Sequence, residues 1–224
     1  MLRMVLVFAW VAATTAAHAQ TAPSRSEMAA YRGLHQAAQS GDAGEIRRLA
    51  AAGADVNERD RHGRAPVHVA AFASSDGALR ALAAAGADMN ALENQAYDVV
   101  TIAAVADDPG LMTLAIALGN DPGLTTSPYR GTALIAAAHL GHVEVVRRLI
   151  AAGASLDHVN NLGWTALMEA VVLGDGGLNH QQVVRLLVEA GADQSKADRD
   201  GVSPLAHARA RGYAEIASLL EKRR

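Results

Sequence analysis

Two sets of residues have the types and spacing that metal ions prefer. His139 and His142 form a His-x-x-His motif, in which two imidazoles lie close enough to bind one zinc ion. Asp107 and Asp108 are adjacent acids before a proline. A zinc site needs further ligands, and the repeat pattern places no third histidine or carboxylate beside the histidines. Adjacent acids before a helix are more often caps that the helix dipole favours. We therefore expect no metal ion and no cofactor.

Catalytic groups are equally scarce in the sequence. There is no cysteine, so thiolate chemistry and disulfides are excluded. We find no Ser-His-Asp set and no glycine-rich phosphate loop before a helix, and we expect no catalytic residues. A metal-dependent enzyme is the alternative to a chain without catalysis. The formal net charge of −3 argues against a nucleic-acid binder, which usually carries a basic domain or stripe.

The elements that must position any functional residue recur at a fixed spacing. Two independent series, with intervals of 33 to 38 residues, mark the end of each unit and the start of each first helix. They are Gly53, Gly86, Gly119, Gly153 and Gly191, and Leu34, Val67, Val100, Leu134, Leu167 and Leu205. A period near 33 residues predicts stacked repeats, each of which buries its apolar face against its neighbours.

The clearest unit runs from residue 131 to 154. Thr132 is placed to cap a first helix, and Gly141-His142 ends it. Residues 143–150 carry an apolar stripe at helical spacing, and Gly153 follows where a left-handed residue is favoured. The unit therefore predicts two short helices packed back to back.

The motifs of these units resemble the ankyrin repeat. The opening Gly-x-Thr-Pro-Leu-His is met in part by residues 63–68 (GRAPVH), 131–134 (GTAL), 163–167 (GWTAL) and 201–205 (GVSPL), and the middle Gly-His-x-Glu-Val-Val by 141–146 (GHVEVV). The resemblance covers residues 30–224. It implies an all-α repeat solenoid of stacked helix-turn-helix ankyrin repeats with short β-hairpin-like loops. About six repeats are expected, at approximately 30–59, 60–92, 93–127, 128–159, 160–197 and 198–224.

The first 19 residues differ in kind from the rest. Arg3, an apolar run from Met4 to Ala13 and the triplet Ala17-His18-Ala19 predict a signal peptide over residues 1–19. The run is too short to span a bilayer, and a disordered or membrane-lying segment is the alternative. We expect a bacterial protein exported to the periplasm, with no stable membrane insertion after cleavage. Residues 20–29 are expected as a flexible lead, and a first helix is expected over Glu27 to Ser40.

Two features leave alternatives open. His68 stands at the histidine position of the family, where a structural hydrogen bond to neighbouring loops is the favoured interpretation. Residues 174–182 (GDGGLNHQQ) place five extra residues between two helices. They form either a tolerated surface loop, because added loop length costs little entropy, or a binding loop or ion site that uses Asp175 and Asn179.

The resemblance also implies where a partner would bind. Ankyrin arrays use their loop tips and the outward positions of each first helix, which line a concave groove. For Trp164 the alternative is packing under its own hairpin. Carried onto this chain, the candidate partner-binding residues are Arg59, Arg61, Phe72, Asn94, Tyr97, Tyr129, His139, Asn161, Trp164 and Arg199.

These observations predict a protein-interaction scaffold in the periplasm that binds a protein partner of unknown identity without catalysis. The chain is expected to be a monomer, with self-association through an end repeat as the alternative. The resemblance adds two narrower alternatives. One is an inhibitor or immunity-type protein for a periplasmic toxin or enzyme, and the other is an accessory factor in protection from oxidants alongside catalase.

Overall fold

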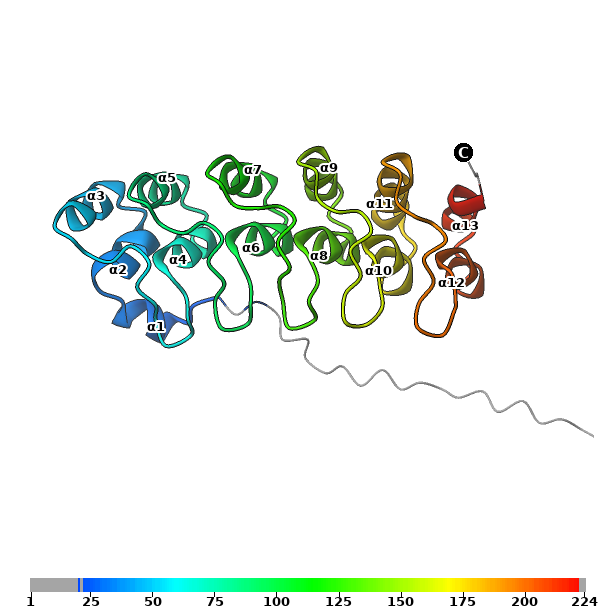
Figure 1. Cartoon of the computed structure of the whole chain (residues 1–224), viewed down its shortest axis with the longest axis horizontal. Coiled ribbons are helices and arrows are strands. Elements are labelled where there is room, and N and C mark those ends of the chain that lie inside the picture. Colours follow the sequence, from blue (N-terminus) through cyan, green and yellow to red (C-terminus); the bar gives the residue numbers. More distant parts are fainter. Residues whose placement is uncertain (1–19, 21, 222–224) are drawn as a thin grey trace, which may run out of the picture.

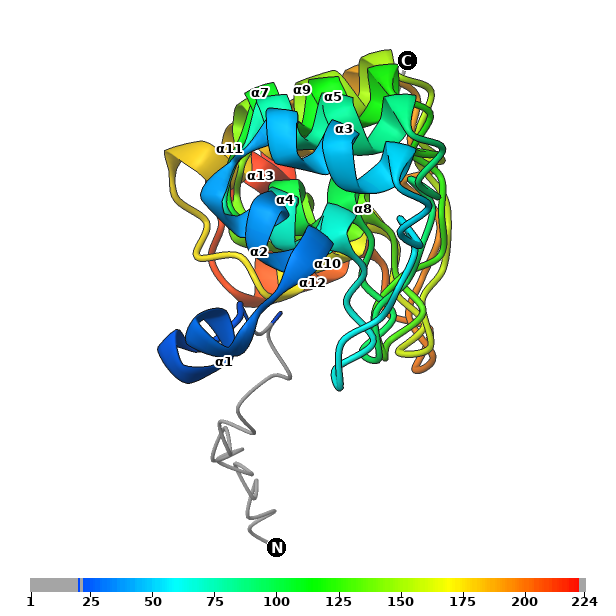
Figure 2. The ribbon, with the colours of Figure 1, turned by 90° about the vertical axis from the view of Figure 1, so that its left-hand side faces the viewer.

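The computed structural model describes residues 20 and 22–221, and the predicted signal peptide lies outside this range. The described chain is a row of helix pairs, and the loops that join the pairs all project from the same side of the row, as Figures 1 and 2 show. This arrangement confirms the predicted all-α repeat solenoid. None of the described helices has the length and apolar character needed to cross a membrane.

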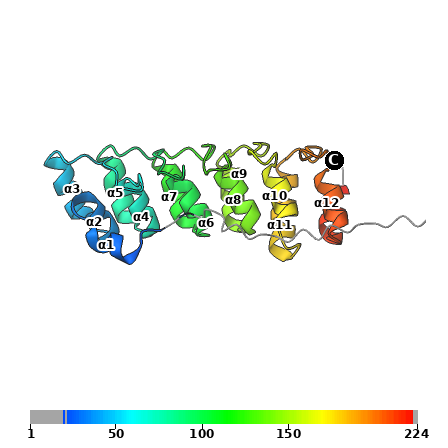
Figure 3. The same ribbon diagram turned by 90° about the horizontal axis from the view of Figure 1, so that it is seen from below.

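The helices of the array form two layers, one above the other in Figure 1, and Figure 3 shows from below how the helix pairs follow one another along the row. Each inner helix contacts the next inner helix, and each outer helix contacts the next outer helix. The inner layer is α2 (Gly33–Ser40), α4 (Pro66–Phe72), α6 (Val99–Val105), α8 (Ala133–Leu140), α10 (Ala166–Val172) and α12 (Pro204–Ala210). The outer layer is α3 (Ala43–Ala51), α5 (Asp76–Ala84), α7 (Pro109–Ala117), α9 (Val143–Ala151), α11 (Leu178–Glu189) and α13 (Ala214–Glu221).

The structure confirms the predicted caps at Thr132 and Asp108, whereas Asp107 is not a cap. Each capping side chain accepts a hydrogen bond from the backbone N–H three residues further on, which satisfies a donor that the helix leaves free. Asp107, which stands before such a cap, adopts a left-handed conformation with φ 52° in the turn before α7. The caps are Asp98 of α6, Asp108 of α7, Thr132 of α8 and Ser203 of α12.

The loops between repeats are hairpins closed by a recurring hydrogen bond. In four of them a backbone N–H donates to the carbonyl four residues on, at 3.0–3.1 Å: Asp60 to Arg64, Glu93 to Tyr97, Asn160 to Trp164 and Asp198 to Val202. The fifth loop is closed by an antiparallel bridge between Thr126 and Gly131. The β-hairpin-like loops are therefore present, although the described residues form no extended strand.

The N-terminal segment differs from the prediction of a flexible lead followed by one helix. A separate helix, α1 (Arg25–Ala30), begins at a capping box made by Ser24 and Glu27. The chain then turns into α2, whose first residue, Gly33, has a left-handed conformation with φ 54°. Tyr31 fixes this turn because its ring is buried and its hydroxyl donates to Asp60 Oδ2 at 2.9 Å.

The insertion also differs from the expected loop over residues 174–182. Only residues 173–177 separate α10 from α11, and the remaining residues extend α11 to 12 residues, against nine in α9. The reason is tertiary: the buried imidazole of His180 lies 2.9 Å from the His139 carbonyl and 2.8 Å from Asp175 Oδ1. The first turn of α11 is therefore hydrogen-bonded to the neighbouring repeat through His180.

Candidate partner-binding face

The inner helices and the hairpin loops form one continuous side of the molecule, which we call the inner face. Figure 2 looks along the row and shows the loops projecting away from the helix layers on this side. The candidate partner-binding residues come from the loops and from the ends of the inner helices. Their side chains divide into four groups with different environments.

Four of the predicted residues bind the neighbouring loop. The Arg59 guanidinium donates to the Leu92 carbonyl, and the Arg199 guanidinium donates to the Asn161 carbonyl. Asn94 Nδ2 donates to the Arg61 carbonyl at 3.4 Å, and Asn161 Nδ2 donates to the Pro128 carbonyl at 3.2 Å. These side chains are exposed, yet part of their hydrogen-bonding capacity joins adjacent repeats.

Arg61 belongs to a charged cluster that holds α1. Its guanidinium lies 3.4 Å from Glu27 Oε1. The buried Arg64 donates to Glu27 Oε1 at 2.6 Å and to Asp60 Oδ2 at 2.8 Å. Hydrogen bonds from Ser24 and Arg64 lower the pKa of Glu27 to about 2. A cavity of about 290 Å³ lies beside this cluster, between α1 and the first hairpin.

The predicted aromatic residues are unequally accessible. Tyr97 is only 7% exposed and belongs to the core, so its side chain does not reach the surface. Phe72 is half-buried and packs against the core, and Trp164 is half-buried in its hairpin. Tyr129 is 38% exposed. Of the four, Tyr129 presents the most accessible ring to a partner.

The exposed large apolar side chains are concentrated in repeats four and five. In the part of the chain that the structure describes, all of them fall between residues 129 and 178. Five of the six lie on hairpins or at the ends of inner helices, whereas Leu178 begins the outer helix α11, and exposed apolar surface is a feature of interaction sites. They are Tyr129, Leu140, Val159, Leu162, Leu173 and Leu178.

Glu169 on α10 is a buried acid within these two repeats, and the sequence analysis did not single it out. Its Oε1 accepts a hydrogen bond from Asn160 Nδ2 at 2.8 Å, which links the inner helix to the base of its own hairpin. Its Oε2 lies 3.7 Å from Nδ1 of His139 on α8. The Glu169 side chain is 5% exposed, whereas the His139 side chain is 44% exposed.

Burial sets the protonation of this pair. Because desolvation penalises the charged carboxylate, it raises the pKa of Glu169 to about 7, although the Asn160 hydrogen bond opposes the shift. Burial and the charge of His180 lower the pKa of His139. The imidazole is therefore neutral at pH 7 and supplies no full positive charge to the carboxylate.

The other imidazoles that the sequence singled out bind backbone groups. His142 Nδ1 lies 2.9 Å from the Ala104 carbonyl. His68 accepts from the Ala65 N–H at 3.0 Å through Nδ1, and its Nε2 lies 2.9 Å from the Ala91 carbonyl. The structural interpretation of His68 is thus confirmed. The described residues contain no group of three or more histidines and carboxylates that could hold a metal ion.

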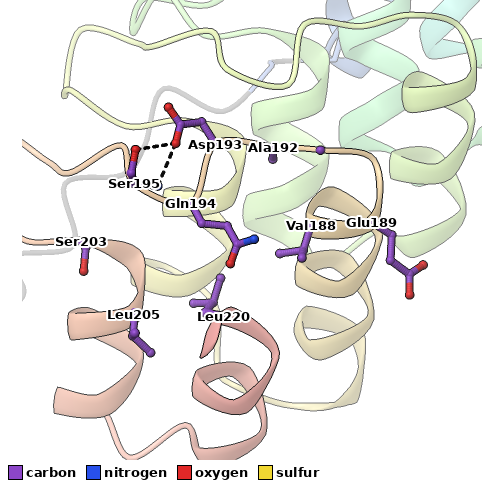
Figure 4. A pocket seen from close by; sticks show the side chains of 10 residues that line it. Val188, Glu189, Ala192, Asp193, Gln194, Ser195, Ser203, Leu205 and Leu220 are labelled. Carbon is purple, nitrogen blue, oxygen red and sulfur yellow. Dashed lines mark hydrogen bonds between the residues drawn. The ribbon is translucent and has the colours of Figure 1, made fainter. Parts of the chain in front are cut away.

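A larger cavity, of about 790 Å³, lies at the end of the array between α11, the last hairpin, α12 and α13 (Figure 4). Its walls combine Val188, Leu205 and Leu220 with the Gln194 amide. Asp193 accepts hydrogen bonds from the Ser195 N–H and hydroxyl, as the dashed lines in Figure 4 show.

The comparisons with known proteins agree with this architecture. The family of ankyrin repeats in three copies matches residues 100–198. The ankyrin repeat protein YahD of Escherichia coli (strain K12) is 36% identical over 185 residues, which cover 82% of this chain and 92% of YahD. The chain therefore belongs to the ankyrin-repeat family, whose members are typically interaction domains.

Solved structures show the same fold. An ankyrin repeat domain from Acinetobacter baumannii AYE (ABAYE2397) is 45% identical, with a TM-score of 0.78 over 84% of this chain and 95% of that one. The ankyrin repeat protein EF0377 is 31% identical, with a TM-score of 0.79 over 87% and 100%. A chain in the structure of the endopeptidase Bd0816 from Bdellovibrio bacteriovorus in complex with immunity protein Bd3460 is 21% identical, with a TM-score of 0.67 over 87% and 99%. This last likeness concerns the fold alone.

Replacing Glu169 by glutamine is expected to remove a pH-dependent loss of stability. The pKa of about 7 in the folded chain exceeds the ordinary 4.5, so the folded state holds the proton more tightly. This stabilisation is full below about pH 4.5 and is lost as the pH rises through 7. Between about pH 5 and pH 8 the original chain should lose roughly 3 kcal/mol relative to Glu169→Gln in urea unfolding.

The matched control is Glu189→Gln, at an exposed acid on α11. Its unfolding free energy should follow that of the original chain at every pH. Parallel pH profiles for Glu169→Gln and the original chain would contradict the raised pKa.

Proposed function

We propose that the chain is a scaffold that binds a protein partner through the inner face of repeats four and five. The observation that carries the proposal is the concentration of exposed apolar side chains in these repeats. Tyr129 and Leu162 on the hairpins, with Leu140 at the end of α8, offer apolar area for burial. The rigid stack holds these groups in place, so binding costs little ordering of the scaffold.

A photo-cross-linking amino acid placed at position 162 tests this proposal. Leu162 is exposed on a hairpin of repeat five, and Arg80 is an exposed position on the outer helix α5. In cells of the source organism we expect a discrete adduct from position 162 and none from position 80. Mass spectrometry then identifies the partner. The same adduct from both positions, or an adduct from position 80 alone, would contradict binding through the inner face.

We propose further that the scaffold acts in the periplasm. The support is the sequence of residues 1–19, with Arg3, the apolar run and the triplet Ala17-His18-Ala19. In fractionated cells the protein should appear in the periplasmic fraction, and N-terminal sequencing should read from Gln20. A protein that keeps Met1 and stays in the cytoplasmic fraction would overturn this proposal without affecting the binding face.

The inhibitor or immunity-type role and the role in oxidant protection stay predictions from the resemblance. The structure that contains immunity protein Bd3460 shares the fold at 21% identity, which carries no partner over to this chain. The partner identified from position 162 separates the two roles. A toxin or hydrolytic enzyme favours the first, and a catalase or another oxidant-handling protein favours the second.

A further inference from the structure

An acid occupies an inner-helix position that other repeats fill differently. Glu169 lies two residues after Leu167, which marks the start of the first helix in repeat five. The equivalent residues in the other repeats are Gln36, Val69, Ile102, Ala136 and His207. Glu169 is therefore the acidic residue among these six equivalent positions, and its side chain is buried.

Two hairpin acids elsewhere in the array have a basic side chain of the same chain beside them, whereas Glu93 in repeat three accepts hydrogen bonds from the backbone N–H groups of Gln95 and Tyr97. In repeat two, Asp60 Oδ2 accepts a hydrogen bond from Arg64 Nε at 2.8 Å. In repeat six, Asp198 Oδ2 lies 2.7 Å from His207 Nε2, so a hairpin acid meets an inner-helix imidazole. In repeat two the Arg64 guanidinium therefore balances the charge of the Asp60 carboxylate.

In repeat five the acid lies on the inner helix and its polar partner lies on the hairpin, which is the opposite of repeat six. Its hairpin supplies the amide of Asn160, and its inner helix supplies the carboxylate of Glu169. Oε1 is satisfied by this amide, but the 3.7 Å from Oε2 to His139 Nδ1 is too long for a hydrogen bond. Because a carboxylate can accept about four hydrogen bonds, Oε2 keeps acceptor capacity that these contacts leave unfilled.

Keeping an acid here costs stability, and residues that weaken a fold in this way are frequent at binding sites. The surroundings suit a long cationic side chain. His139 borders Oε2 and is itself accessible, and Leu140 and Leu173 are exposed at the ends of the same two inner helices. Lysine and arginine pack their aliphatic stems on apolar surface while their heads bind an acid.

We propose that Glu169 Oε2 binds a lysine or arginine side chain of the protein partner. The incoming cation takes the place that the Arg64 guanidinium takes beside Asp60 in repeat two. This inference rests on the proposed function, since it names the partner chemistry for the same face. Arginine adds a planar fork of donors, and lysine adds a compact point charge.

Peptides selected for binding to the purified full chain test the inference without knowledge of the natural partner. Every basic residue of each binding peptide is replaced by a neutral one, arginine by citrulline and lysine by norleucine. Affinities are then measured for the original chain and for Glu169→Gln. Glutamine keeps the side-chain shape and an acceptor for Asn160, so the variant is expected to fold.

We expect one basic peptide residue whose neutral replacement weakens binding to the original chain at least about tenfold, as close interfacial charge pairs do. The same replacement should change the affinity for Glu169→Gln by less than about twofold. The exposed-acid control Glu189→Gln should behave like the original chain. This pattern assigns the coupling to Glu169 and not to the overall charge of the protein.

The outcomes distinguish the inference from the function on which it rests. If Leu162→Ala weakens the peptides but no basic peptide residue couples to Glu169, the inner face binds and the cation site is wrong. If Leu162→Ala and Tyr129→Ala leave every peptide unaffected, the inner face is not the binding surface. If no peptide binds at all, both the proposed function and the inference fall.

Discussion

One helix pair of this chain cannot bury its own apolar face, and every other feature of the structure follows from that constraint. The inner helices pack side by side through small residues such as Ala103, Ala137 and Ala170, which are fully buried. Most backbone polar groups buried by such packing must find a hydrogen-bond partner. The hairpins therefore repeat the same closing hydrogen bond, and their side chains bond to the next hairpin.

The sequence was sufficient to predict the stack because the determinants of each unit are local. Thr132 and Asp108 cap the helices that follow them, as predicted, and the period places every inner helix. The two errors in the fold have tertiary causes. The break between α1 and α2 depends on Tyr31 reaching Asp60, and the longer α11 depends on His180 reaching the neighbouring repeat. The sequence pattern within one repeat predicts neither contact, because each contact joins residues that are far apart in the chain.

The binding face was less predictable than the fold. Arg59 and Arg199 are exposed at loop tips, but only the structure shows that they bond to adjacent loops. Tyrosine is a residue type that is common in interfaces, but Tyr97 lies in the core. The repeat pattern does place Glu169, an acidic residue, at a position on the inner helix. Its significance depends on Asn160 and His139, which the repeat pattern alone does not place beside it.

The central claim is that repeats four and five bind the partner through the inner face. Hydrogen exchange of the chain, measured with and without the partner recovered by cross-linking, tests it most directly. Binding through the inner face should slow exchange in the hairpins over residues 126–131 and 158–164 and at the ends of α8 and α10, and should leave the outer helices unchanged. Protection confined to repeats one and two, or to the cavity beside α13, would contradict it.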